Sequence, residues 1–437
     1  PYTIFENTYK LKPGHILNLD FAEQSLDITQ YWNVETFYRL PKLEMPYEDA
    51  KENVHQLLRT ASTYRMVADV PVGVFLSGGY DSTAVTAILQ KDNTEKIKTF
   101  TIGFEEGNNE APFAKETAEY LGTDHTEFIC TAKEAQKIIP DLPYFFDEPF
   151  ADSSAIPTIL VSRLARQQVT VALSADAGDE VFAGYTRYAD LGKKLYQLNR
   201  LPDTIKPVAS MVTALASRMV SNKRPELKHK LHGVSKAIQS DRLKQSSVLF
   251  QLMNSLPKSY RQDLFLSRKP DYSTGYSIDT SGFHHELEIA MAVDYQLYLQ
   301  NDILTKVDRA TMSVSLEGRE PLLDQRLVEF AAQLPFEYKY DGKTAKRILK
   351  DIVHEYIPKK MMDRPKSGFS LPIYVWLRGD LSYLFDEYLN EKAIGISGLF
   401  DTKFVMEQVR KFKNGSLHYD PFIWKMLMFQ MWYKRWM

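Results

Sequence analysis

The sequence contains very little cysteine, since Cys130 is its only one. This excludes a disulfide framework and a cysteine-ligated zinc site, and it favours a reducing compartment, which we expect to be the cytoplasm. Neither charge is in large excess: the net charge is −2, so no overall basic field points to nucleic acid. Apolar runs long enough to cross a membrane are also missing, and the first residues, PYTIFENTYK, lack the charged start and apolar core of a signal peptide.

The remaining composition is that of an ordinary globular protein, with 44% hydrophobic and 25% charged residues. A length of 437 residues exceeds what one compact core usually holds, which predicts two domains or one large one. The chain begins at Pro1, without an initiating methionine and with sequence typical of the middle of a domain. We therefore expect it to be a fragment or a processed product.

The first residues, up to about residue 34, are predicted to form short β-strands. Two β-rich runs flank a Pro13–Gly14 turn in YKLKPGHILNLD, and LDITQYWNV follows as a third. A polar linker punctuated by prolines comes next. The apolar spacing after it predicts a helix from about Pro46 to Val67.

From residue 72 onward, predicted strands alternate with predicted helices of about ten residues. Strands are expected at 72–76 and in IKTFTIGF, HTEFIC and VTVALS, and most of the chain beyond residue 186 is compatible with helix. This pattern predicts an α/β fold, with a doubly wound parallel sheet followed by a helical C-terminal region. Ligands of such sheets bind at the carboxyl ends of the strands, where Ser77 and Ser174 lie.

The stretch SGGYDS, residues 77–82, connects a predicted strand to a predicted helix. Backbone N–H groups at a helix start attract anions, glycines allow close approach, and the two serines add hydroxyl donors, so a phosphate group is the expected ligand. Asp81 would repel a phosphate unless a divalent cation bridges the two, and hard oxygen ligands favour Mg²⁺. No lysine follows the glycines, which excludes the common G-x-x-x-x-G-K-[ST] loop. The alternative is a tight turn in which Asp81 or Ser82 caps the helix.

A second acidic stretch, LSADAGDEVFAGY, ends another predicted strand. It places Asp176, Asp179 and Glu180 so close that the carboxylates repel one another unless a cation or a proton relieves them. The alternative is an acidic helix N-terminus stabilised by the helix dipole. The position of this stretch at a neighbouring strand end favours a site shared with residues 77–82.

Both stretches resemble motifs of one enzyme family. Residues 77–82 are similar to the S-G-G-x-D-S pyrophosphate-binding loop of the N-type ATP pyrophosphatases, and Ser174–Tyr185 is similar to the asparagine synthetase signature S-G-[DE]-G-x-D-E-[LV]-F-x-G-Y. The segments LTKVDRATMSVSLEGREPLLD, DGKTAKRILKDIV and DRPKSGFSLPI follow in family order, so the resemblance covers nearly the whole chain. It implies an ATP pyrophosphatase domain over residues 41–437. The L-x-P-G-H and Y-W matches near the start imply that residues 1–40 end a glutaminase domain.

The resemblance implies ATP and Mg²⁺ as cofactors and suggests roles for individual residues. Asp81 and Asp179 would hold Mg²⁺ on the pyrophosphate, and Lys366 would contact the phosphates as pyrophosphate leaves. Asp176 would manage protons during ammonia attack at the substrate, and Lys306 would bind the substrate carboxylate. The other expected ATP contacts are Ser77, Gly78, Gly79, Ser82, Ser174 and Ala175, with adenine against the backbone at Leu76 and Ile102.

The implied reaction transfers AMP onto a carboxylate, aspartate first of all, and lets ammonia displace AMP to give an amide. The ammonia would come from glutamine in a glutaminase domain. Its nucleophilic cysteine cannot be the internal Cys130, which we expect to be buried and inert. Two alternatives stay open: amidation or cyclisation of another carboxylate such as a sugar uronate, and a nucleotide-binding scaffold without catalysis. Assembly as a homodimer also stays open.

Some positions depart from the family pattern. Asp176 stands where asparagine synthetases have a glutamate, and Ala175 and Ala177 replace glycines. Because alanine resists a positive φ, the turn is expected to differ slightly. Tyr80 stands where the family often has leucine and is expected to pack beneath the loop.

Ordinary ion pairing is the expectation for Asp308 with Arg309 and for Glu317 with Arg319.

Overall fold

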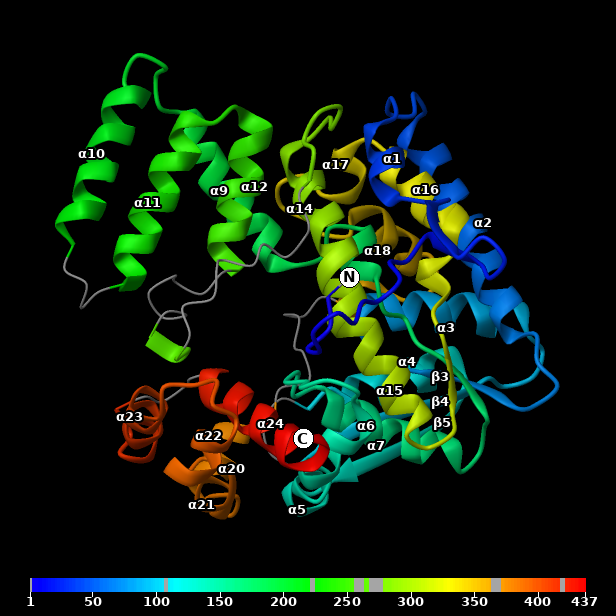
Figure 1. Ribbon diagram of the computed structural model, residues 1–437. Helices are drawn as coiled ribbons and strands as arrows, with labels where there is room; N and C mark the ends of the chain where they lie inside the picture. The colour runs from blue at the N-terminus through cyan, green and yellow to red at the C-terminus, as the bar shows by residue number, and fades with distance from the viewer. Residues whose placement is uncertain are drawn as a thin grey trace.

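The computed structural model describes residues 2–105, 109–220, 225–254, 263–266, 278–362, 371–416 and 421–437. At its centre lies a five-stranded sheet whose strands all run parallel, in the order β5-β4-β3-β6-β7. Figure 1 labels β3, β4 and β5 of this sheet. The predicted α/β fold is thereby confirmed. The strands are β3 (Val72–Phe75), β4 (Lys98–Phe104), β5 (Asp124–Cys130), β6 (Val171–Leu173) and β7 (Glu317–Arg319).

Helices make up most of the remaining described chain, and the predicted helical C-terminal region is confirmed. Up to residue 220 they are α1 (Val34–Arg39), α2 (Tyr47–Met66), α3 (Tyr80–Asp92), α4 (Ala111–Leu121), α5 (Ala132–Gln136), η1 (Ile139–Asp141), α6 (Leu142–Phe145), α7 (Ala155–Arg166), α8 (Gly178–Val181), α9 (Thr186–Asn199) and α10 (Lys206–Met219). Beyond it follow α11 (Pro225–Gln239), α12 (Arg242–Asn254), α14 (Glu286–Asp294), the π-helix η2 (Tyr295–Leu304), α15 (Thr305–Met312), η3 (Pro321–Leu323), α16 (Gln325–Gln333), α17 (Phe336–Lys339), α18 (Arg347–His354), α19 (Lys359–Met362), α20 (Ile373–Arg378), α21 (Tyr383–Tyr388), α22 (Glu391–Ile396), α23 (Thr402–Lys413) and α24 (Pro421–Trp436).

Helices cover both faces of the parallel sheet, because successive side chains of a strand point to opposite faces and both sets are apolar here. Val74 belongs to an apolar cluster that includes residues of α2 and α3. The next residue, Phe75, packs instead against a cluster that includes Ala165 of α7. The sheet is therefore doubly wound, as the alternating pattern predicted.

The strand order reverses at β3. The chain passes from β3 outward to β4 and β5, then returns to the other side of β3 to form β6 and β7. Val74 of β3 is in register with Leu173 of β6, so the segments that leave these two strands start side by side. In open parallel sheets such a switch point is where ligands bind.

Two large apolar clusters hold the described part of the chain together. One includes residues of α2, α3, α14, α16 and α18, and the other joins α7 to the C-terminal helices α20–α24. In Figure 1 these C-terminal helices (orange to red) lie apart from the group formed by α9–α12 (green). No helix within the described ranges is long and apolar enough to cross a bilayer.

Near the start of the chain, where the sequence predicts short strands, β1 (His15–Asp20) and β2 (Ser25–Gln30) form an antiparallel hairpin. All of its residues except His15 are exposed, so apolar side chains on both faces meet solvent. The strand predicted before the Pro13–Gly14 turn is wrong: only an isolated bridge between Tyr2 and Tyr9 occurs there. Proline has no N–H to donate to a ladder, which limits pairing just before the turn.

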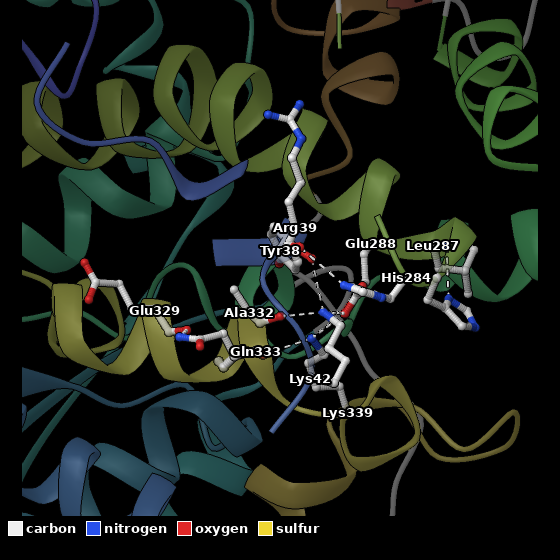
Figure 2. Close-up of polar contacts among 12 residues, drawn as sticks. Tyr38, Arg39, Lys42, His284, Leu287, Glu288, Glu329, Ala332, Gln333 and Lys339 are labelled. Carbon is white, nitrogen blue, oxygen red and sulfur yellow. Dashed lines mark hydrogen bonds and ion pairs between the residues drawn. The ribbon is translucent and has the colours of Figure 1, made fainter. Parts of the chain in front are cut away.

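A buried ion cluster of Lys42, Glu288 and Lys339 ties the segment between α1 and α2 to α14 and α17 (Figure 2). Glu288 Oε1 accepts hydrogen bonds from Lys42 Nζ at 2.8 Å and from Lys339 Nζ at 3.1 Å. The two ammonium groups also donate to the carbonyls of Ala332 and Ala331 near the C-terminal end of α16, where the helix dipole favours cations. Burial lowers the pKa of Lys339 to about 8, although the Glu288 charge acts to raise it.

Candidate active site

A cavity of about 700 Å³ lies at the carboxyl ends of β3 and β6. Its lining includes residues 77–82, which follow β3, and most of residues 174–185, which follow β6. Lys306 and Lys346 contribute to the wall as well. The structure therefore brings the two acidic stretches of the sequence into one site at the switch point of the sheet.

The loop after β3 has the geometry of an anion-binding helix start. α3 begins at Tyr80, and Gly79 is its N-cap without a side-chain cap. The Ser77 and Ser82 hydroxyls lie 3.0 Å apart, and Ser77 Oγ accepts the Gly79 N–H at 3.2 Å. Gly78 has a φ of 72°, which glycine adopts without steric strain. Hydroxyls and backbone amides thus gather at one helix start, an arrangement that suits a phosphate group.

Leu76 and Ile102, the residues expected beside adenine, line the same cavity with buried side chains. They come from the ends of adjacent strands, since the Leu76 N–H donates to the Phe100 carbonyl at 2.9 Å. Tyr80 extends from the loop after β3 toward α18, and its hydroxyl lies 3.4 Å from His354 Nε2. Its ring packs against the apolar cluster that also includes residues of α18.

Two of the three carboxylates after β6 accept hydrogen bonds from hydroxyl groups. Asp176 Oδ2 accepts the Ser174 hydroxyl at 2.5 Å. Glu180 is buried, and its Oε1 accepts the Tyr185 hydroxyl at 2.6 Å. Burial raises the pKa of Glu180 to about 7, although the Tyr185 hydrogen bond acts in the opposite direction. Binding of a proton to Glu180 would relieve part of the repulsion that the sequence predicted for this cluster, and the raised pKa brings that binding closer to neutral pH.

The negative charge of the third carboxylate, Asp179, is neutralised by a lysine that the sequence analysis did not identify. Lys346 Nζ lies 2.8 Å from Asp179 Oδ1 and also contacts Asp81 Oδ2. Its side chain is 8% exposed. Burial acts to lower the pKa of Lys346, but the charges of Asp81 and Asp179 outweigh it and raise the pKa. Lys346 also has a φ of 54°, a strained conformation of the kind that clusters at functional sites.

Two glycines allow these charged groups to meet. A Cβ on Gly178 would lie 2.4 Å from Asp81 Oδ1. A Cβ on Gly184 would lie 2.0 Å from Lys346 Cε and 2.1 Å from Asp179 Oδ1. Neither glycine has a positive φ, so the requirement is for space rather than for a special backbone conformation.

Gly184→Ala is therefore expected to destabilise the protein by about 1–3 kcal/mol, because the added methyl must displace Lys346 or Asp179. Urea denaturation followed by circular dichroism measures the change. The control is Gly395→Ala in α22, where a Cβ would meet nothing within 4 Å and should stabilise the helix slightly. Equal stability of Gly184→Ala and wild type would show that the three charged groups are not fixed as described.

The residues present fit a magnesium ion that arrives with a phosphate ligand. Within the described part of the chain, no group of three or more His, Cys, Asp and Glu side chains is arranged to hold a metal by itself. Asp81 and Asp179 supply two carboxylates at neighbouring strand ends. Mg²⁺ is commonly bound by one or two carboxylates together with substrate phosphates and water.

The two alanines that replace family glycines lie in the turn before α8. Ala177 has a φ of 78°, which lies in the left-handed region although alanine carries a Cβ. Such a conformation costs about 1–2 kcal/mol for a residue with a side chain. Ala175 lines the cavity. Ala177 thus holds this turn in a strained left-handed conformation.

The cavity wall around Lys306 carries groups of both charges. Lys306 Nζ lies 3.1 Å from Ser154 Oγ and 3.4 Å from Asp152 Oδ2 in the cavity wall. One turn earlier, burial raises the pKa of Asp302 to about 6, and the Asp152 charge adds to this effect. The other lysine expected in the site, Lys366, lies outside the described residues.

Several residues have the structural roles that the sequence predicted. Cys130 is fully buried, and burial raises the pKa of its thiol to about 11, as expected for an inert cysteine. The two predicted ion pairs also form: Arg309 Nη1 lies 2.5 Å from Asp308 Oδ2, and Arg319 Nε lies 2.7 Å from Glu317 Oε1.

The family model described as asparagine synthase matches residues 53–434. The chain belongs to the asparagine synthase family. This family member is 28% identical to glutamine-hydrolyzing asparagine synthetase 1 of Bacillus subtilis over 436 residues, which cover 99% of this chain and 66% of that protein. It is 31% identical to a putative glutamine-hydrolyzing asparagine synthetase of Mycobacterium tuberculosis, over 99% of this chain and 65% of that protein.

Other relatives of this family member have different names. A protein named amidase chyE, of Penicillium rubens, is 24% identical over 94% of this chain and 65% of that protein. The chain thus spans about two thirds of the length of these curated relatives. The resemblance found in the sequence is confirmed, and the matched region contains both acidic stretches and Lys346.

Proposed function

We propose that this asparagine synthase family member uses ATP to convert a carboxylate, aspartate in the first place, into an amide, with AMP and pyrophosphate as the other products. The observation that carries this proposal is the meeting of Asp81, Asp179 and Asp176 beside the phosphate loop at the switch point of the sheet. The relatives named asparagine synthetase, which align with 99% of the chain, support aspartate as the acid.

The first step would activate the carboxylate, because attack of ammonia on a free carboxylate must expel oxide. The hydroxyls of Ser77 and Ser82 and the amides of Gly78 and Gly79 would bind and orient the phosphates of ATP. Asp81 and Asp179 would hold Mg²⁺, which when bound neutralises charge on the departing pyrophosphate. Lys366 is also proposed to neutralise charge on the departing pyrophosphate. The backbone at Leu76 and Ile102 is proposed to contact adenine.

In the second step ammonia would attack the carbonyl carbon of the acyl-adenylate. As the C–N bond forms and AMP leaves, the nitrogen must lose a proton. We assign the acceptance of this proton to Asp176, whose carboxylate lies in the cavity wall and is held by the Ser174 hydroxyl. Lys306 would bind a carboxylate of the substrate, since its ammonium group lies in the same wall.

The ammonia is proposed to come from glutamine, hydrolysed by a glutaminase domain to which residues 1–40 belong, while residues 41–437 form the ATP pyrophosphatase domain. The exposed β1–β2 hairpin supports this division, because a two-stranded hairpin is marginally stable unless it packs on a further surface. Residues 41–437 are expected to make amide from free ammonia, and glutamine hydrolysis is assigned to the glutaminase domain. Glutamine hydrolysis by this chain alone would contradict the division.

Exchange of labelled pyrophosphate into ATP tests the proposed activity. The assay is run with aspartate, with sugar uronates and with amino-acid derivatives, since only an acid that is adenylated supports the reverse reaction. We expect exchange with aspartate. If only other acids support exchange, aspartate is not the substrate. If no acid supports exchange, the result favours a nucleotide-binding scaffold without catalysis.

A further inference from the structure

The pair of Asp81 and Asp179 already has a cation, Lys346, in the position that a metal would take. We propose that Lys346 is the resident counter-ion of this pair, and that Mg²⁺ replaces it only when a phosphate ligand arrives to accept the lysine. The inference rests on the proposed use of ATP and Mg²⁺. It adds that Mg²⁺ binds to the two aspartates only together with a phosphate ligand, and not before it.

The geometry makes the lysine and the metal competitors. Lys346 Nζ lies 2.8 Å from Asp179 Oδ1 and contacts Asp81 Oδ2 at the same time. Mg²⁺ binds carboxylate oxygens at about 2.0–2.1 Å and in a near-octahedral arrangement. An ammonium group that holds one oxygen of each carboxylate occupies the space between them, so both cations cannot bridge the pair together.

The lysine is fixed in this position by its surroundings. Its backbone takes a left-handed conformation directly before α18, and its Cε is so close to Gly184 that a Cβ there would lie 2.0 Å away. Its side chain is 8% exposed, so it cannot move into solvent without a rearrangement. Mg²⁺ alone would have to displace a buried ammonium group that then lacks an anion, which is costly.

A phosphate group removes this obstacle because it offers the lysine a new anion inside the same cavity. Residues 77–82 and Lys346 line that cavity together. When Mg²⁺ takes the two carboxylates, the ammonium group can turn to a phosphate oxygen without leaving the site. The exchange keeps every charge near an opposite charge at each stage, which binding of Mg²⁺ alone would not.

Isothermal titration of the protein with MgCl₂, with and without pyrophosphate, tests this exchange. For wild type we expect Mg²⁺ affinity to be at least about 10-fold higher when pyrophosphate is present. Lys346→Met removes the competitor, so Mg²⁺ alone should bind at least about 10-fold more tightly than to wild type. In this variant pyrophosphate should add less to the affinity, because the lysine that binds it is gone.

Lys343→Met is the matched control, because it removes the same charge from an exposed lysine three residues earlier. We expect it to bind Mg²⁺ like wild type. Lys346→Arg should retain the dependence on pyrophosphate, and circular dichroism checks that each variant is folded. Wild type that binds Mg²⁺ equally well without pyrophosphate would overturn the inference, whatever the variants do. Since the titration uses neither ATP nor a carboxylic acid, its outcome is independent of whether the exchange assay finds a substrate.

Discussion

Asp81→Asn is expected to lower carboxylate-dependent pyrophosphate exchange on the order of 100-fold or more, while the protein stays folded. The asparagine has the size of aspartate and keeps an oxygen that can accept a hydrogen bond from Lys346. It lacks the negative charge that a hard divalent cation requires. Exchange rates at saturating ATP measure the effect, and circular dichroism reports the fold.

The control for this variant lies at the other end of the same helix. Asp92 is also on α3, where its Oδ2 lies 2.6 Å from Arg59 Nε in a solvent-accessible ion pair. Such pairs contribute about 0–1 kcal/mol, so Asp92→Asn should exchange pyrophosphate within about twofold of wild type. Wild-type exchange by Asp81→Asn would remove Asp81 from the proposed metal site. Equal losses in both variants would point to a general effect of the lost charge instead.

Glu288→Gln is expected to lower the free energy of unfolding by about 3–5 kcal/mol. Glu288 accepts hydrogen bonds from both Lys42 and Lys339, and the side chains of Glu288 and Lys339 are 0% exposed (Figure 2). Glutamine fills the same space but carries no charge, so both lysines would lose their anion, and Lys339 must either stay charged without one or give up its proton. Urea denaturation of both proteins measures the difference.

Two further variants show whether charge burial is the cause. Glu116→Gln on the exposed side of α4 removes one carboxylate without a buried partner, and it should change the unfolding free energy by less than about 0.5 kcal/mol. Glu288→Leu combined with Lys339→Met replaces most of the cluster by apolar groups and should recover much of the loss. A loss below about 1 kcal/mol for Glu288→Gln would mean that solvent or other groups compensate the two lysines.

The shared position of the two acidic stretches could be predicted from the sequence because it depends on local patterns. A buried strand followed by SGGYDS, and another followed by the Ser174 segment, place both stretches at carboxyl strand ends. In a parallel sheet these ends lie on one edge. The order of β3 and β6 as neighbours then follows from the return of the chain after β5.

Lys346 could not be found in this way because nothing local marks it. The sequence around it, DGKTAKRILKDIV, contains several lysines, and the resemblance covered them all equally. It is the packing of α18 on α3 that places Lys346, and not its neighbouring lysines, against the two aspartates. The short, charged strand β7 was also not predicted, because its side chains do not have a strand pattern. Its three residues are held by backbone hydrogen bonds, such as the one from the Ser174 N–H to the Arg319 carbonyl at 2.9 Å.

The contact between Lys346 and Asp81 spans 265 residues of sequence. During translation, at roughly 5–20 residues per second, the ribosome therefore releases the acidic loop tens of seconds before the lysine that neutralises it. Until residue 346 emerges, Asp81 and Asp179 have no lysine between them. We therefore expect the repulsion between these two carboxylates to keep this end of the sheet from closing until late in synthesis.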